Sequence, residues 1–251
     1  MPPSPTQSLL QLSVENSRFA TRPLFWTSQH LDLLGIRFLH FDRPIHAPQP
    51  RGDAAEDLDA VNVIFHVMRL ATVPDTESKI KSAIHLLCTP GSPLQLKPKP
   101  QAISPDAATG YRVCLLPNIP PSHPRKKVNS PVRRLCDSHL RRIIPENWAE
   151  DPYIVCLLLS LAQAQAIKQK RAMPETFPVR LLVAFDGDKS FAHVFQADVD
   201  ARILQALNEP RFDLNGITWP NVTHTKVAFD PYLTFPHRIV AEMLGSYMEH
   251  M

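Results

Sequence analysis

The most regular run of apolar residues in the chain begins just after Asp151. Apolar side chains fill nearly every position from Ile154 to Leu161, which predicts a helix that is buried on most sides. Asp151 suits the N-cap, Pro152 suits the first helical position, and the basic residues within 168–171 favour the C-terminal end. We therefore predict a buried helix over about 152–170 at the centre of the core.

The segments after this helix alternate between strand and helix patterns. Val179–Phe185 and Phe191–Ala197 have the apolar character of strands, and the polar turn between them predicts a hairpin. Val199–Leu207 then predicts a helix, Thr225–Phe229 a short strand and Phe235–Met248 a terminal amphipathic helix. The expected C-terminal order is helix, strand, strand, helix, strand, helix.

The first part of the chain also mixes the two kinds of pattern. His30–Ile36 has helical spacing of apolar residues, and Arg37–Asp42 alternates like a half-buried strand. Val61–Leu70 is apolar and partly β-branched, which predicts a strand, whereas Asp75–Leu87 has helical periodicity. We assign residues 1–96 to an N-terminal α/β portion.

Residues 97–146 differ in composition from both flanks. Ten lysines and arginines, two acidic residues and eight prolines fall between residues 97 and 142. This balance indicates a Pro-rich basic linker or excursion, in which Tyr111–Leu116 favours a short strand and Val132–Ile143 a short helix. With residues 147–251 as the C-terminal core, we predict one composite α+β domain whose small mixed sheet packs on the buried helix.

Composition excludes several devices for binding cofactors and metals. The chain has 26 prolines and 7 glycines, and neither a dinucleotide-binding glycine motif nor a phosphate-binding P-loop occurs. The four cysteines form no C-x-x-C pair, and the histidines show no common metal-ligand spacing. We expect no cofactor and no metal.

The N-terminus and the apolar runs bear on location. The N-terminus lacks the basic and apolar regions of a secretory signal, and the longest apolar run, Tyr153–Ala162, is shorter than the roughly 20 residues that span a bilayer. We expect a soluble protein of the cytoplasm or nucleus that is not secreted and has no membrane partner.

Several short segments near the C-terminus together resemble a known group of proteins. They are Asp151-Pro152-Tyr153, Leu161-Ala162-Gln163 with Gln165, Val179-Arg180-Leu181-Leu182-Val183, Phe191 to Asp198, and Phe235-Pro236-His237-Arg238. On these segments, roughly the last 100 residues resemble a group of filamentous-fungal proteins. The resemblance implies a fungal source and a shared fold unit, and it carries over no activity and no catalytic residue.

One set of candidate residues suits acid/base chemistry. A pocket that gathered Asp151, Tyr153, His193 and His237 would combine a carboxylate with two imidazoles. Asp151 and the two histidines also have structural explanations, because Asp151 suits a helix cap and the histidines suit a buried strand position and a helix start.

A second set of residues invites comparison with metal-dependent nucleases. The candidates are Glu150 or Asp151, Asp186 or Asp188, Asp198 and Lys226. Position 196 is Gln where a second acidic ligand is expected, and no Glu-x-Lys follows. Helix caps at Asp151 and Asp198 and a turn at residues 186–188 explain the same residues.

The Pro-rich basic linker of residues 97–146, called the basic stretch below, is the candidate surface for nucleic acid. Its densest charges suit phosphate contacts or nuclear import, and they are Arg125, Lys126, Lys127, Arg133 and Arg134. Tyr111 is the only aromatic residue near them, although single-strand readers usually interleave aromatics with charge. A solvated basic loop is the favoured interpretation.

Three functions remain open on this basis. We favour a non-catalytic binding or accessory protein whose partner is a protein or a small molecule. The alternatives are a lineage-restricted small-molecule enzyme, for example of specialised metabolism, and a nucleic-acid-binding or nuclease-like protein. An enzyme predicts a deep pocket where a carboxylate meets a histidine with shifted pKa values, and a binding protein predicts an exposed apolar patch.

Overall fold

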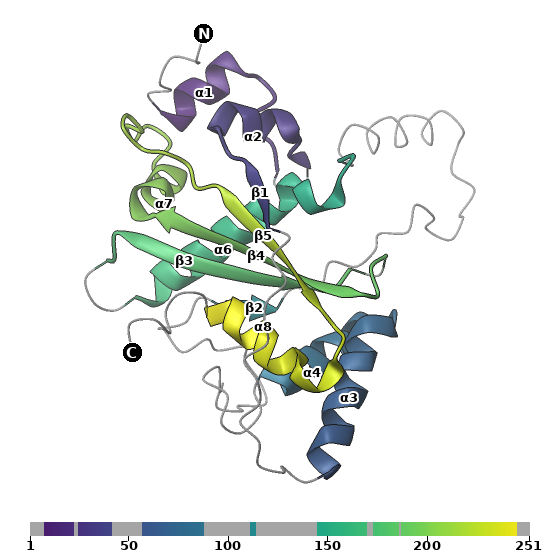
Figure 1. Cartoon of the computed structure of the whole chain (residues 1–251). Helices are drawn as coiled ribbons and strands as arrows, with labels where there is room; N and C mark the ends of the chain where they lie inside the picture. The colour runs from purple at the N-terminus through teal and green to yellow at the C-terminus, as the bar shows by residue number, and fades with distance from the viewer. Residues whose placement is uncertain are drawn as a thin grey trace. The chain divides into compact units, whose positions relative to one another are not determined.

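The structure is a computed structural model that describes residues 8–22, 25–41, 57–87, 111–113, 145–169, 173–185 and 187–244 (Figure 1). The fold is α+β, which confirms the predicted class. Five strands form one sheet in the order β1-β5-β4-β3-β2. Their bounds are β1 Phe38–Phe41, β2 Tyr111–Val113, β3 Thr176–Val183, β4 Phe191–Asp200 and β5 Val222–Ala228. The sheet is mixed, because β4 pairs antiparallel with β5 whereas β2 runs parallel to β3.

The chain divides into two compact units, each assembled from three separate segments. The first unit takes residues 1–39, 120–179 and 197–222, and the second takes residues 40–119, 180–196 and 223–251. The divisions fall within strands β1, β3, β4 and β5. Each unit therefore draws residues from both sides of the basic stretch.

The first unit is organised by α6, which spans Pro152–Lys168 and confirms the predicted central helix. The Asp151 side chain caps it by accepting a hydrogen bond from the backbone N of Tyr153 at 2.8 Å. Buried residues lie all around its first three turns, from Ile154 to Ala162. The helices α2 (Ser28–Leu34) and α7 (Ala201–Asn208) both pack on α6, and α1 spans Leu9–Glu15.

The start of α7 corrects a prediction. Asp198 is not its N-cap, because β4 continues through Asp200. Asp200 caps the helix instead, and its Oδ1 accepts a hydrogen bond from the backbone N of Arg202 at 2.8 Å. The alternating burial of β4 persists to Val199, which is fully buried and extends the strand beyond the predicted end.

The second unit packs three helices on one face of its part of the sheet. They are α3 (Asp57–Thr72), α4 (Thr76–Leu87) and α8 (Phe235–Leu244). Figure 1 shows α3 and α4 side by side, with α8 beside α4. Their buried side chains form one core with Ala192, Val194 and Val227 of the sheet. This face of β4 and β5 is therefore apolar and covered.

The predicted strand over Val61–Leu70 is wrong, because this segment is part of helix α3. Val67, Leu70 and Ala71 are buried in the shared core, and their spacing of three and four residues fits one helical face. Packing against α4 thus outweighs the strand preference of the β-branched side chains.

The remaining predicted elements are found close to their expected positions. Helix α2 ends at Gly35, whose φ of 68° is a left-handed conformation that glycine adopts without strain. Strand β1 lies within the predicted 37–42, β2 begins at Tyr111, and α4, β3, β5 and α8 overlap their predicted ranges. The predicted helix over 132–143 falls outside the described residues. In the described part of the chain, no helix is long and apolar enough to cross a membrane.

Candidate functional site

Three histidines from neighbouring strands form a continuous row in the second unit. Nδ1 of His40 on β1 lies 2.7 Å from Nδ1 of His224 on β5. Nε2 of His224 lies 3.0 Å from Nδ1 of His193 on β4. Asp188, in the turn before β4, follows at the far end, with Oδ2 at 3.2 Å from Nε2 of His193. We call these four residues the histidine row.

Strand register places the row on one face of the sheet. In the antiparallel ladder, His224 lies opposite Phe195, and His193 lies opposite Lys226. Directly paired residues share a face, so these side chains lie on the face opposite Ala192 and the helical core. The row therefore belongs to a layer separate from the core formed by α3, α4 and α8.

The Asp188 carboxylate is held in place by the backbone of its own turn. Its Oδ1 accepts hydrogen bonds from the backbone N of Ser190 at 2.9 Å and of Phe191 at 3.1 Å. This arrangement leaves Oδ2 directed at His193. At 3.2 Å, that contact is the longest in the row, and it is a close electrostatic contact rather than a hydrogen bond.

Burial keeps the inner two histidines neutral. His193 and His224 are each 2% exposed. Loss of hydration lowers the pKa of His224 to about 3, and repulsion from His193, His40 and Lys226 acts in the same direction. Burial also lowers the pKa of His193, and it outweighs the attraction of Asp188. At neutral pH both rings therefore carry one proton each.

Ring packing fixes the orientation of His224. Its ring stacks on Phe195, with centroids 4.6 Å apart, and on His193, with centroids 5.2 Å apart. The His40 ring meets it edge-on, at an interplanar angle of 89°. Because His40 is exposed whereas the inner rings are buried, the row connects the surface to the interior.

The second feature of this unit is an exposed apolar face on α3. Val61, Phe65 and Met68 follow one another at helical spacing and are 64%, 49% and 47% exposed. Ile84 of the neighbouring helix α4 is also exposed. We call these four residues the α3 face. Exposed apolar side chains at such spacing along one helix are typical of docking surfaces.

A cation lies beside the α3 face. The guanidinium carbon of Arg69 lies 5.2 Å from the centroid of the Phe65 ring. The buried Nε of Arg69 makes no hydrogen bond within the part of the chain that the structure describes. Nearby, His66 stacks on His85 with centroids 3.9 Å apart, and burial followed by repulsion from His85 and Arg69 lowers the pKa of His66. The surroundings of the α3 face therefore favour a negatively charged group.

The four residues predicted for an acid/base pocket occupy different places. Asp151 and Tyr153 belong to the start of α6 in the first unit, where burial raises the pKa of Asp151. His193 belongs to the histidine row. His237 is exposed on α8, which packs on the sheet face opposite His193. The structure does not bring His193 and His237 together.

The residues considered for a nuclease site also have defined positions. Asp188 ends the histidine row, Asp198 is exposed on β4, and Lys226 is exposed opposite His193. Gln196 donates a hydrogen bond to Oε1 of Glu242 at 2.7 Å. No group of three or more histidine, cysteine or acidic side chains is placed to hold a metal among the described residues. Asp186 lies outside them.

The charged positions of the basic stretch are likewise not described. Arg125, Lys126, Lys127, Arg133 and Arg134 all lie between residues 114 and 144. Their proposed contact with nucleic acid stays a prediction.

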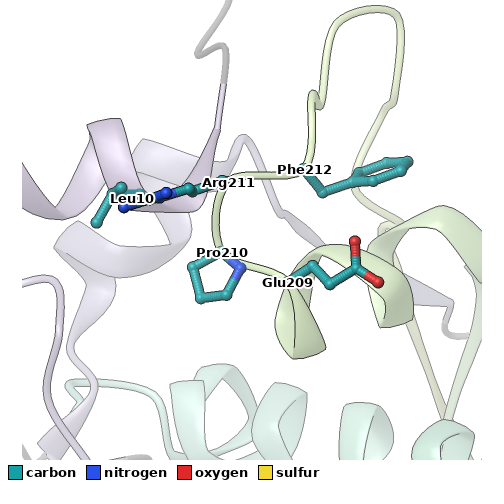
Figure 2. A pocket seen from close by; sticks show the side chains of 5 residues that line it. All are labelled: Leu10, Glu209, Pro210, Arg211 and Phe212. Atoms are coloured by element: carbon teal, nitrogen blue, oxygen red, sulfur yellow. The ribbon is translucent and has the colours of Figure 1, made fainter.

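A surface depression of about 570 Å³ lies in the first unit (Figure 2). It is lined by Leu10 of α1 and by residues 209–212, which follow α7. The backbone N of Leu10 donates a hydrogen bond to the carbonyl O of Pro210 at 2.8 Å, so the depression borders a joint between α1 and this loop. Its lining holds no histidine. It therefore has no pairing of a carboxylate with an imidazole for acid/base work.

Two members of the histidine row, His40 and His224, had no place among the predicted site residues. Their sequence signal is a histidine within each of two short strands, and only the strand pairing shows that they meet.

Comparison of the chain with protein families, with curated proteins and with solved structures finds no match. The functional argument therefore depends on the geometry of this chain alone.

Proposed function

We propose that this protein is a non-catalytic binding protein that docks through the α3 face, and that its first partner is a second copy of the chain. The observation that carries the proposal is the exposure of Val61, Phe65 and Met68 along one helix. Apolar anchors at such spacing are typical of helices that dock on another helix or groove.

An enzymatic function is less well supported than a binding function. A carboxylate does meet a histidine with a lowered pKa at Asp188 and His193, which is one half of what an acid/base enzyme requires. The other half is a pocket around the pair. The depression described above is lined by residues of the first unit, whereas both of these residues belong to the second.

Charge favours a second copy as the partner. The sequence of α3 begins Asp57-Leu58-Asp59, and its last turn carries Arg69. In a two-fold symmetric pair the same surface serves both partners, so two α3 helices run antiparallel. The acidic first turn of one copy then approaches Arg69 of the other. The same arrangement sets Val61 against Met68 and brings the two Phe65 rings together at the symmetry axis.

The size of the α3 face sets the expected affinity. Stable interfaces bury about 800 Å² on each partner, and one helix of 16 residues with a single contribution from α4 offers less. We therefore expect a reversible dimer with a dissociation constant on the order of 1–100 μM.

Sedimentation velocity over a concentration series tests the proposal. The unchanged chain should shift from monomer to dimer across about 1–200 μM, because this range brackets the expected dissociation constant. Phe65→Glu should stay monomeric throughout, since it places two carboxylates against each other at the axis. Val14→Glu adds the same charge at an exposed position of α1 and should dimerise like the unchanged chain.

Three outcomes would contradict the proposal. A monomer at every concentration would remove the second copy as the partner. A Phe65→Glu variant that lost thermal stability would mean that a segment of the same chain covers the α3 face. Dimerisation unaffected by Phe65→Glu would place the interface elsewhere.

A further inference from the structure

We propose that the pair of helices α3 and α4 binds a phosphate-class oxyanion through Arg69, His66 and His85. Its basis is that three nitrogen-rich side chains gather on two adjacent helices, and no described side chain supplies them with a carboxylate. We call these three residues the oxyanion site. The oxyanion site borders the α3 face, but binding of the anion does not depend on dimerisation.

Helix geometry gathers the three side chains. Arg69 follows His66 by three positions on α3, so the two side chains are neighbours on one side of that helix. His85 belongs to α4, which packs on α3, and its ring stacks on the ring of His66 with centroids 3.9 Å apart and an interplanar angle of 28°. Both neighbours repel a proton on His66, which places all three groups within electrostatic reach of one small ligand.

Ser82 sets the orientation of the His66 ring. Ser82 is 1% exposed, and its Oγ lies 3.3 Å from Nδ1 of His66. This contact occupies Nδ1 and leaves Nε2, which makes no hydrogen bond within the described part of the chain. When the hydroxyl donates to Nδ1, the neutral ring carries its proton on Nε2 and can donate it to an oxyanion. Ser82 is therefore a positioning residue of the oxyanion site.

The positive charge of the oxyanion site is not neutralised by the described residues. Among them Arg69 makes no hydrogen bond or ion pair, and its buried Nε has no acceptor. The acidic residues at the start of α4 are engaged elsewhere: Asp75 accepts from the backbone N of Ser78 at 2.8 Å, and Glu77 pairs with Lys81 at 2.7 Å. Because donors without acceptors are rare in folded proteins, this cluster favours an anionic ligand.

The arrangement of donors suits a phosphate better than a carboxylate. A guanidinium presents a planar fork of N–H groups, and the two imidazoles add donors from a second direction. The oxygens of a phosphate point in several directions and carry up to two negative charges, so one phosphate can accept from all three side chains. The two oxygens of a carboxylate lie in one plane and serve fewer of them.

Phosphate binding should also change the protonation of His66. In the free chain, burial followed by repulsion from His85 and Arg69 lowers the pKa of His66. The element η3 (Tyr232–Thr234), which also packs on α3, carries no charged residue, and Lys79 of α4 is buried and adds positive charge. A bound dianion reverses the balance of charge around the ring, so it should favour the imidazolium form.

A phosphate titration followed by NMR of the imidazole rings tests the oxyanion site. At constant ionic strength and a pH near 7, His66 and His85 should shift along one saturation curve with a dissociation constant on the order of 1 mM. His237, exposed on α8, should not shift. Saturating phosphate should raise the pH midpoint of the His66 titration by about one unit. Acetate at the same ionic strength should bind roughly tenfold more weakly.

Two matched variants separate a defined site from diffuse attraction. Arg69→Met keeps the apolar stem beside Phe65 and removes the fork, so it should weaken phosphate binding about tenfold. Lys81→Met removes the same charge from an exposed position of α4 and should leave the affinity unchanged. Thermal midpoints report whether both variants keep the fold.

Three results would overturn the proposal. They are the absence of saturable shifts at His66 and His85 in the unchanged chain, equal weakening by the two variants, and equal affinity for acetate and phosphate. The first result needs no variant, so it decides even where Arg69→Met fails to fold. Dimerisation is read separately by sedimentation, so the oxyanion site and the dimer can each fail alone.

Discussion

Nδ1 of His193 lies 3.0 Å from Nε2 of His224, although 31 positions separate the two residues in the chain. Both rings are buried, and burial lowers the pKa of each below that of a solvated histidine. The contact therefore joins two neutral imidazoles and ties β4 to β5 through side chains as well as through the ladder. It also links folding to pH.

We predict that the protein loses stability as pH falls below about 6.5. In the unfolded chain His224 titrates near its ordinary value of 6.5, whereas in the folded chain its pKa is about 3. The unfolded state thus binds more protons between these values, so the stabilising contribution is complete above 6.5 and is lost as pH falls toward 3. One such histidine contributes a slope of about 1.4 kcal/mol per pH unit, measurable from urea midpoints.

His224→Asn isolates this contribution from general acid unfolding. Asn stays neutral at every pH, so the variant should show a shallower decline between about pH 6 and 4 than the unchanged chain. Its stability at neutral pH should be lower, because His193 and His40 lose a partner. Equal slopes for the two proteins would show that His224 does not titrate in the way its burial requires.

We predict that Arg238 is the most sensitive polar position of the second unit. Its side chain is 4% exposed, and Nη2 donates to the carbonyl oxygens of residues 228–231 at 2.7–3.3 Å. Arg238→Met keeps the apolar stem and removes these donors. These carbonyls, of which that of Phe229 is buried and the others are partly buried, then lose their donor, and the free energy of unfolding should fall by about 2–4 kcal/mol in a urea titration.

Arg202→Met is the matched control for Arg238. Arg202 is exposed and pairs with Asp200 at 2.6 Å, and exposed ion pairs contribute little. Its urea midpoint should stay close to that of the unchanged chain. Similar losses for both variants would mean that the carbonyl contacts of Arg238 add little to stability.

Much of the fold could be predicted from local pattern. Helix α6 is marked by Asp151, Pro152 and a long apolar run, and these features act within the segment itself. The α3 segment could not be assigned so easily, since its apolar positions satisfy both a buried strand and a helix. The helical conformation is favoured by packing against α4, which presents a complementary helical surface to Val67 and Leu70.

The candidate site was harder to predict than the fold. His193 was identified from its strand, but its partners depend on which strands pair and in which register. A shift of one residue would turn His224 to the opposite face of the sheet. The exposed stripe on α3 was missed for a related reason, because only a helix brings Val61, Phe65 and Met68 onto one face.

We predict that the basic stretch does not bind nucleic acid at physiological ionic strength. The chain carries a net charge of only +3, and Tyr111 is the only aromatic residue near the basic cluster. Mixed DNA and RNA should therefore show weak binding that disappears with added salt. The control changes Arg125, Lys126, Lys127, Arg133 and Arg134 to Ala. Tight, salt-sensitive binding that this variant loses would instead establish a nucleic-acid surface.

Cysteine cross-linking across the α3 face tests the central claim most directly. A disulfide needs Cα atoms within about 7 Å, which antiparallel pairing allows at the symmetry axis. Phe65→Cys should give a covalent dimer under mild oxidation, whereas two copies of Val61→Cys would lie roughly 10 Å apart along the helix axes and should not. The unchanged chain sets the background from its own cysteines. A dimer band specific to Phe65→Cys is the predicted result, and equal cross-linking at both positions, or none at either, would contradict docking through this face.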